Sequence, residues 1–142
     1  MCKLLKPHKP IDYERPSPQD WLPASAVKWD RGKGRLTVDL PKNGEIWITD
    51  VQDTNSMDGF FDIGHSVVLW NGFKSDQLAI GDIAVYYNSQ NPMGCIHQII
   101  DIKAVDYGLE FTFQGMNPLI TIPDPVPVRV GEIRWVMLGV IY

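Results

Sequence analysis

The sequence predicts an all-β protein built as a small barrel or sandwich, and three observations support this prediction. Apolar and polar residues alternate with period two in short segments such as Arg35–Leu40 and Leu109–Gln114. Turns rich in Gly, Pro and Asn separate these segments at regular spacing, which is typical of barrels and sandwiches. No segment keeps a 3.6-residue apolar period over three helical turns. We therefore expect strands throughout and no long helix.

The predicted strands can be placed in chain order. The β pattern begins at Val27, and a Gly-Lys-Gly turn leads into the strand Arg35–Leu40. Asn43-Gly44, the strongest short hairpin signal in the chain, then precedes the next strand. Gly139 lies inside the last strand and indicates either a bulge or a close backbone approach. A short helical turn is expected near Ser75–Leu78, and the remaining strands are expected at Ile46–Thr49, Ser66–Trp70, Ile83–Tyr87, Cys95–Ile102, Leu109–Gln114 and Ile133–Tyr142.

Residues 1–28 differ in composition from the rest of the chain. Five prolines and little periodicity exclude a long helix there, so we expect an extended arm. Trp21 and Leu22 are candidate anchors for this arm in a groove. The arm can lie on its own domain or on a second copy of the chain, which would form a homo-oligomer, and both arrangements stay open. Residues 29–142 are expected to form one β domain with its own core.

Composition and charge limit the classes of function. A net charge of −4 gives no sign of a basic surface that would attract nucleic acid. The arm also lacks the paired helices of a helix-turn-helix. No apolar run approaches the roughly 18–20 residues that span a bilayer. Cys2 and Cys95 form no disulfide framework, and neither has a histidine at the usual spacing of a metal site. We therefore expect a reduced, cytoplasmic protein with no cofactor and no metal.

Three polar residues occur in an order that suits nucleophilic catalysis. Ser56 lies in a polar turn after a predicted strand, where a serine can serve as a nucleophile if a base lies nearby. Turn formation alone also explains a serine among Asn, Asp and Gly. His97 shares a strand face with Cys95, which suits either a hydrogen-bonded imidazole or a base at a cleft. Asp124 lies between two prolines, where an aspartate is also common as a turn residue.

Five blocks resemble, in order and spacing, the conserved blocks of signal peptidases and LexA-like peptidases. Residues 81–86 look like the Gly-Asp-Ile-Val-Val-Tyr strand of this superfamily, and residues 96–100 resemble the Ile-His-Arg-Val-Ile block of archaeal and endoplasmic-reticulum signal peptidases. The other similar blocks are Ser56-Met57 with 62–69, then 111–117 and 123–128. The resemblance implies a small barrel-like β fold that hydrolyses peptide bonds in a protein or peptide substrate. It also implies that Ser56 is the nucleophile, His97 the general base and Asp124 the carboxylate supporting the histidine.

Several positions depart from this family pattern. Gln98 stands where the family has an arginine, and Met116 stands where it has an aspartate. His65 replaces an aspartate, and Asp58-Gly59 replaces an acidic-Pro pair. No apolar run resembles the membrane anchor of a signal peptidase. These departures support an alternative: a catalytically inactive member of the fold that acts as a binding or assembly module, for example in a phage protein.

A third interpretation is a self-cleaving regulator of the LexA/UmuD type, which a short N-terminal arm suits. That branch uses a lysine as the base, and Lys74 and Lys103 are the candidates downstream, although neither stands at the family's position. The arm also carries no obvious small-residue cleavage site. Two further residues have weaker claims to a role in the site: His65 as a second base or a surface-turn residue, and Asp53 as a cap of the serine turn. We expect His8 to be a solvated terminal residue.

Overall fold

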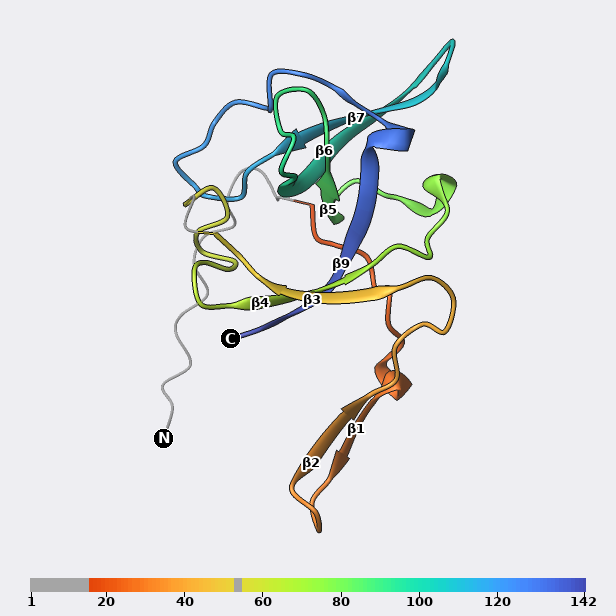
Figure 1. The fold of residues 1–142 in the computed structure, drawn as a ribbon, viewed down its shortest axis with the longest axis vertical. Helices are drawn as coiled ribbons and strands as arrows, with labels where there is room; N and C mark the ends of the chain where they lie inside the picture. Colours follow the sequence, from red (N-terminus) through yellow and green to blue (C-terminus); the bar gives the residue numbers. More distant parts are fainter. Residues whose placement is uncertain (1–15, 53–54) are drawn as a thin grey trace, which may run out of the picture.

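The computed structural model describes residues 16–52 and 55–142 and is all-β, as expected (Figure 1). No helix in these two ranges is long and apolar enough to cross a membrane. The single-turn 3-10 helices are η1 (Ala24–Ala26), η2 (Ser75–Gln77) and η3 (Val130–Glu132), and η2 is the helical turn expected near Ser75. The strands are β1 (Val27–Asp30), β2 (Arg35–Val38), β3 (Ile46–Asp50), β4 (Ser66–Trp70), β5 (Ile83–Tyr86), β6 (Cys95–Val105), β7 (Gly108–Gln114), β8 (Val128–Arg129) and β9 (Ile133–Ile141).

Seven strands form one antiparallel sheet in the order β3-β4-β9-β5-β6-β7-β8, which curls into a half-barrel. The last strand, β9, lies between β4 and β5 and joins the two halves of the sheet (Figure 1). β1 and β2 form a separate hairpin that projects away from this sheet (Figure 1). Because β1 begins at Val27, the expected boundary between residues 28 and 29 falls inside a strand.

Gly139 lies at a bulge in the pairing of β4 with β9. The register between β4 and β9 shifts where Val68 pairs with Gly139 and Leu69 pairs with Met137, so Leu138 is the extra residue of a bulge. The predicted bulge is therefore confirmed. A Cβ added at Gly139 would meet no atom within 4 Å, so the alternative of a close backbone approach is wrong.

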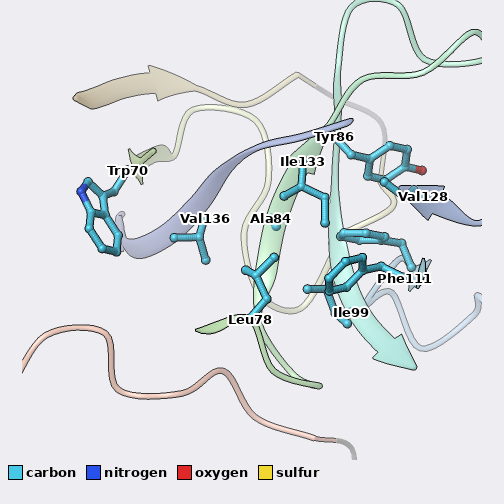
Figure 2. Close-up of a cluster of buried hydrophobic side chains, with 10 residues drawn as sticks. Trp70, Leu78, Ala84, Tyr86, Ile99, Phe111, Val128, Ile133 and Val136 are labelled. Carbon is cyan, nitrogen blue, oxygen red and sulfur yellow. The ribbon is translucent and has the colours of Figure 1, made fainter. Parts of the chain in front are cut away.

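The two faces of β5 contribute to two apolar clusters, because successive strand residues point to opposite faces. Ala84 and Tyr86 belong to the first cluster, and Ile83 and Val85 belong to the second. The second cluster also contains the buried Met57, which follows the candidate nucleophile. Figure 2 shows the first cluster, with Tyr86 and Val128 at one end and Trp70 at the other. The buried members of the first cluster are Trp70, Leu78, Ala84, Tyr86, Ile99, Phe111, Phe113, Val128, Ile133 and Val136.

The described part of the arm binds at the start of β5. Asp82 is fully buried, and its carboxylate accepts hydrogen bonds from the Gln19 backbone and side chain, the Trp21 indole and the Ala79 backbone, at 2.6–3.2 Å. The Trp21 ring also packs edge-on against Trp70, with ring centroids 5.6 Å apart. A buried carboxylate is tolerated when donors satisfy its oxygens, so Asp82 ties the arm to the sheet.

Gln98 holds the same segment from the next strand. Its side chain is buried, and its amide donates hydrogen bonds to the carbonyl oxygens of Pro16 and Gly81 at 2.8 and 3.0 Å. A neutral amide can satisfy two carbonyl acceptors without burying a charge. Gln98 therefore has a packing role beneath the arm.

Candidate active site

His97 and Asp124 form a close pair at the end of the first apolar cluster. Nδ1 of His97 lies 2.7 Å from Oδ2 of Asp124, and both side chains are largely buried. β6 positions the histidine, and the loop after β7 positions the aspartate. The backbone N–H of Asp124 donates to the carbonyl of Phe113 at 2.8 Å, which holds that loop against β7. The structure therefore brings together two of the three residues predicted as catalytic.

Tyr86 completes this pair from β5, and sequence reasoning missed it. Its hydroxyl donates a 2.7 Å hydrogen bond to Oδ2 of Asp124, the same oxygen that faces His97. Burial, followed by hydrogen bonds with Asp124 and Cys95, raises the pKa of Tyr86 far above its ordinary value. The phenol therefore keeps its proton and remains a donor to the carboxylate.

The environment shifts the pKa values of the pair in opposite directions. Burial lowers the pKa of His97, but interactions with Asp124 and Cys95 outweigh it and raise this pKa to about 9. Burial raises the pKa of Asp124, but the His97 contact and the Tyr86 hydrogen bond leave it below its ordinary value of 3.8. At neutral pH, the pair therefore exists mainly as imidazolium and carboxylate.

These shifts predict that His97→Gln destabilises the fold more at pH 6 than at pH 10. A histidine whose folded pKa is raised stabilises the protein fully below its unfolded pKa of 6.5 and loses that contribution as the pH rises through about 9. Because the pKa of Asp124 is lowered in the folded protein, its contribution to stability is present above pH 3.8 and is lost as the pH falls further. At pH 6, the free energy of unfolding of the wild type should exceed that of His97→Gln by on the order of 3 kcal/mol. Urea unfolding of both proteins measures it, and an equal difference at the two pH values would contradict this account.

The main chain of Ser56 lies close to His97, and Gly115 lies beside both residues. A Cβ added at Gly115 would lie 2.6 Å from the carbonyl oxygen of Ser56 and 3.4 Å from Nε2 of His97. Nε2 is the ring nitrogen opposite the one that faces Asp124, and a serine-activating histidine uses this nitrogen. A side chain at position 115 would push the serine turn away, so the glycine permits the close approach.

Asn117 holds the serine turn in this place. Its backbone N–H donates to the carbonyl of Ser56 at 3.0 Å, and its side-chain amide donates to the carbonyl of Asn55 at 2.6 Å. Asn55 adopts a positive φ of 55°, a conformation that asparagine tolerates well. The buried side chain of Met57 anchors the other side of the turn, where its sulfur accepts the backbone N–H of Met116 at 3.4 Å.

The remaining candidates lie in other environments. His65 closes its own turn, where Nδ1 accepts the backbone N–H of Asp62 at 2.9 Å and the ring packs against Tyr142. Lys103 pairs with Asp101 at 3.3 Å and lies about 20 Å along β6 from His97. Three other candidates complete the set: Lys74 is exposed at the start of η2, whereas His8 and Asp53 lie outside the described residues.

A hollow of about 810 Å³ has none of these residues in its lining. Phe73, Tyr87 and Trp135 supply aromatic walls, and Arg134 supplies a positive charge. Its lining contains no carboxylate and no imidazole among the described residues. Acid–base chemistry is therefore better placed at His97 and Asp124 than in this hollow.

Comparisons with protein families, curated proteins and solved structures found no match to this chain. The assignment of chemistry therefore depends on the residues and their geometry.

Proposed function

We propose that this chain is a signal-peptidase-like serine endopeptidase in which Ser56 is the nucleophile, His97 the general base and Asp124 the support of the base. One observation carries the proposal. His97 directs Nδ1 to a largely buried carboxylate, and its Nε2 and the carbonyl oxygen of Ser56 lie 3.4 and 2.6 Å from the position that a Cβ on residue 115 would take. A base oriented on one side and adjacent to a serine on the other is the arrangement that activates a hydroxyl.

The proposed reaction uses these groups in sequence. Nε2 of His97 takes the hydroxyl proton as Oγ of Ser56 attacks the peptide carbonyl, and His97 then gives this proton to the leaving amine. Water, activated by the same nitrogen, then hydrolyses the acyl-enzyme and restores the serine. Asp124 holds the imidazole tautomer and stabilises its charge. Main-chain N–H groups of the serine turn are the donors we expect at the oxyanion.

Features around the pair suit a peptide substrate. The loop between β7 and Asp124 exposes Leu119 and Ile122, which are 87% and 73% accessible to solvent. Exposed apolar side chains on the loop that carries Asp124 offer a surface that an extended peptide can cover. An apolar peptide segment is therefore the substrate class that this surface favours.

The pH dependence of hydrolysis tests the proposal. Because only the neutral imidazole accepts a proton, kcat/KM should rise with pH through an apparent pKa of about 9. The measurement uses a mixture of peptides of varied sequence, a chelator in every assay and mass spectrometry to follow cleavage. His97→Gln is expected to abolish cleavage at every pH. A rate that falls between pH 7 and 9, or hydrolysis that survives His97→Gln, would count against the proposal.

A binding or assembly module is the second candidate, and the β1–β2 hairpin favours it. The hairpin projects from the sheet (Figure 1). Its cross-strand pairs place apolar side chains on one face. Two-stranded hairpins are marginally stable alone, so an exposed apolar face suits a partner. Under this alternative, the protein hydrolyses no peptide, and changes on that face alter association only. The residues of this exposed face are Val27, Trp29, Leu36 and Val38.

A further inference from the structure

We propose that Cys95, His97 and Asp124 form a zinc-binding site and that zinc, by occupying it, switches off the peptidase. The binding site stands on geometry alone, whereas the inhibitory effect rests on the proposed function. The inference runs against the sequence-based expectation of no metal, and it gives a role to Cys95, for which the sequence predicts none.

Three different donor atoms converge in this cluster. The Cys95 sulfur, a ring nitrogen of His97 and a carboxylate oxygen of Asp124 all lie within 4.8 Å of one another. The one-residue gap between Cys95 and His97 is not that of common zinc motifs. On a β-strand, however, residues two apart point to the same face, and β6 supplies both. The fold therefore builds a set of ligands that spacing in the sequence does not indicate.

The donor set matches zinc better than the abundant hard cations. Zn²⁺ binds thiolate, imidazole and carboxylate at about 2.0–2.3 Å, so donors less than 5 Å apart need only small movements to share one ion. Mg²⁺ and Ca²⁺ prefer sites made of oxygen alone. Three protein ligands would leave a fourth tetrahedral position for water.

Tyr86 gives the cluster the outer support that metal ligands usually have. Its buried hydroxyl donates to Oδ2 of Asp124, and Tyr86 lies opposite Cys95 in the β5–β6 pairing. Hydrogen bonds to a ligating carboxylate orient it and increase metal affinity. The three donors are therefore held by two paired strands and one hydrogen-bonded loop.

Zinc and the proposed catalytic state compete for the same atoms. Coordination replaces the 2.7 Å contact between His97 and Asp124 with bonds from each residue to the metal. The Cys95 thiol proton passes to solvent as the sulfur–zinc bond forms, and the proton between His97 and Asp124 also leaves. No electron is transferred, because Zn²⁺ has no redox chemistry. With its imidazole coordinated, His97 cannot accept the serine proton.

Metal titration of the full chain tests the binding site without reference to activity. Cys2→Ser serves as the background, so that Cys95 is the only thiol. Isothermal titration with Zn²⁺ should show one equivalent bound, and Co²⁺ should give thiolate-to-metal charge-transfer absorption. Cys95→Ser and His97→Gln should each weaken binding by more than about tenfold. Asp101→Asn, an exposed acid on the same strand, and Ser56→Ala should leave affinity unchanged. Binding that is absent from the background protein, or unaffected by Cys95→Ser, would overturn the inference.

A parallel assay separates this inference from the proposed function. Zinc at concentrations that fill the site should reduce peptide hydrolysis by at least about tenfold, chelation should restore it, and hydrolysis by Cys95→Ser should be insensitive to the same concentrations. Zinc binding that requires Cys95, with no hydrolysis by the metal-free protein, would reject the peptidase and uphold the site. Hydrolysis that continues with the site filled would reject the inhibitory role.

Discussion

Ser56→Ala is expected to reduce kcat/KM for peptide hydrolysis by roughly 10⁴-fold or more. The change removes only the hydroxyl oxygen that we propose as the nucleophile. The main-chain contacts that hold the turn stay in place, since the carbonyl of Ser56 accepts from Asn117 and the next side chain, Met57, is buried. The fold should therefore persist while the chemistry is lost. Initial rates on a peptide identified from the cleaved mixture measure the loss, and circular dichroism checks the fold.

Ser66→Ala is the matched control for this experiment. Ser66 begins β4, and its hydroxyl donates to a carboxylate oxygen of Asp50 at 2.7 Å, so it is also a hydrogen-bonded serine near a turn. We expect a rate within about threefold of wild type, since exposed surface substitutions usually change stability by less than 0.5 kcal/mol. A Ser56→Ala protein that hydrolyses peptide as fast as Ser66→Ala would remove Ser56 from the mechanism.

Asp124→Asn is expected to reduce kcat/KM by roughly 10³–10⁴-fold and to lower the pKa of His97 at the same time. The asparagine keeps the size of the side chain but removes the charge that favours the imidazolium. It can also present an N–H donor to Nδ1, which selects the wrong imidazole tautomer for a base at Nε2. Burial, which lowers the His97 pKa, then acts without the opposing carboxylate.

Two measurements on Asp124→Asn distinguish a positioning role from simple loss of structure. NMR titration of the His97 imidazole should show a pKa below its wild-type value of about 9, and the rate should fall in the same variant. Asp101→Asn removes an exposed carboxylate that pairs with Lys103 on the same sheet, and it should change neither quantity. An unchanged His97 pKa in Asp124→Asn would show that the carboxylate does not control the base.

The strands were predictable because their signals are local. A glycine turn followed by a short apolar run places β4 at the predicted residues, and the bulge near Gly139 also follows from the local sequence. The insertion of β9 between β4 and β5 was not predictable, because it pairs segments far apart in the chain. Alternation indicates which face of a strand is buried, but it does not indicate which strand lies beside it.

The candidate site shows the same division between local and distant information. Ser56, His97 and Asp124 could be proposed from short blocks that resemble a known superfamily. Tyr86 and Asn117 could not be assigned their roles, because Tyr86 meets Asp124 across 38 residues and Asn117 meets Asn55 across 62. From the sequence alone, Tyr86 looks like a core residue. Only the hydrogen bond from its hydroxyl to Asp124 connects it to the site.

Gln98 shows that a residue next to a candidate site residue can serve another part of the fold. In the sequence it stands beside the candidate base, where the similar block of signal peptidases has an arginine. In the structure its side chain is buried and donates to the carbonyl oxygens of Pro16 and Gly81. A substitution next to a site residue can serve the opposite face of the strand, because neighbouring side chains alternate.

The most direct test of the account is to locate the covalent adduct formed by a fluorophosphonate probe. The metal-free protein is labelled at pH 9, digested and sequenced by tandem mass spectrometry. The account predicts one adduct, on Ser56, which disappears in Ser56→Ala and is strongly reduced in His97→Gln because the base no longer activates the hydroxyl. An adduct on another serine, or peptide hydrolysis that proceeds while Ser56 stays unmodified, would contradict it.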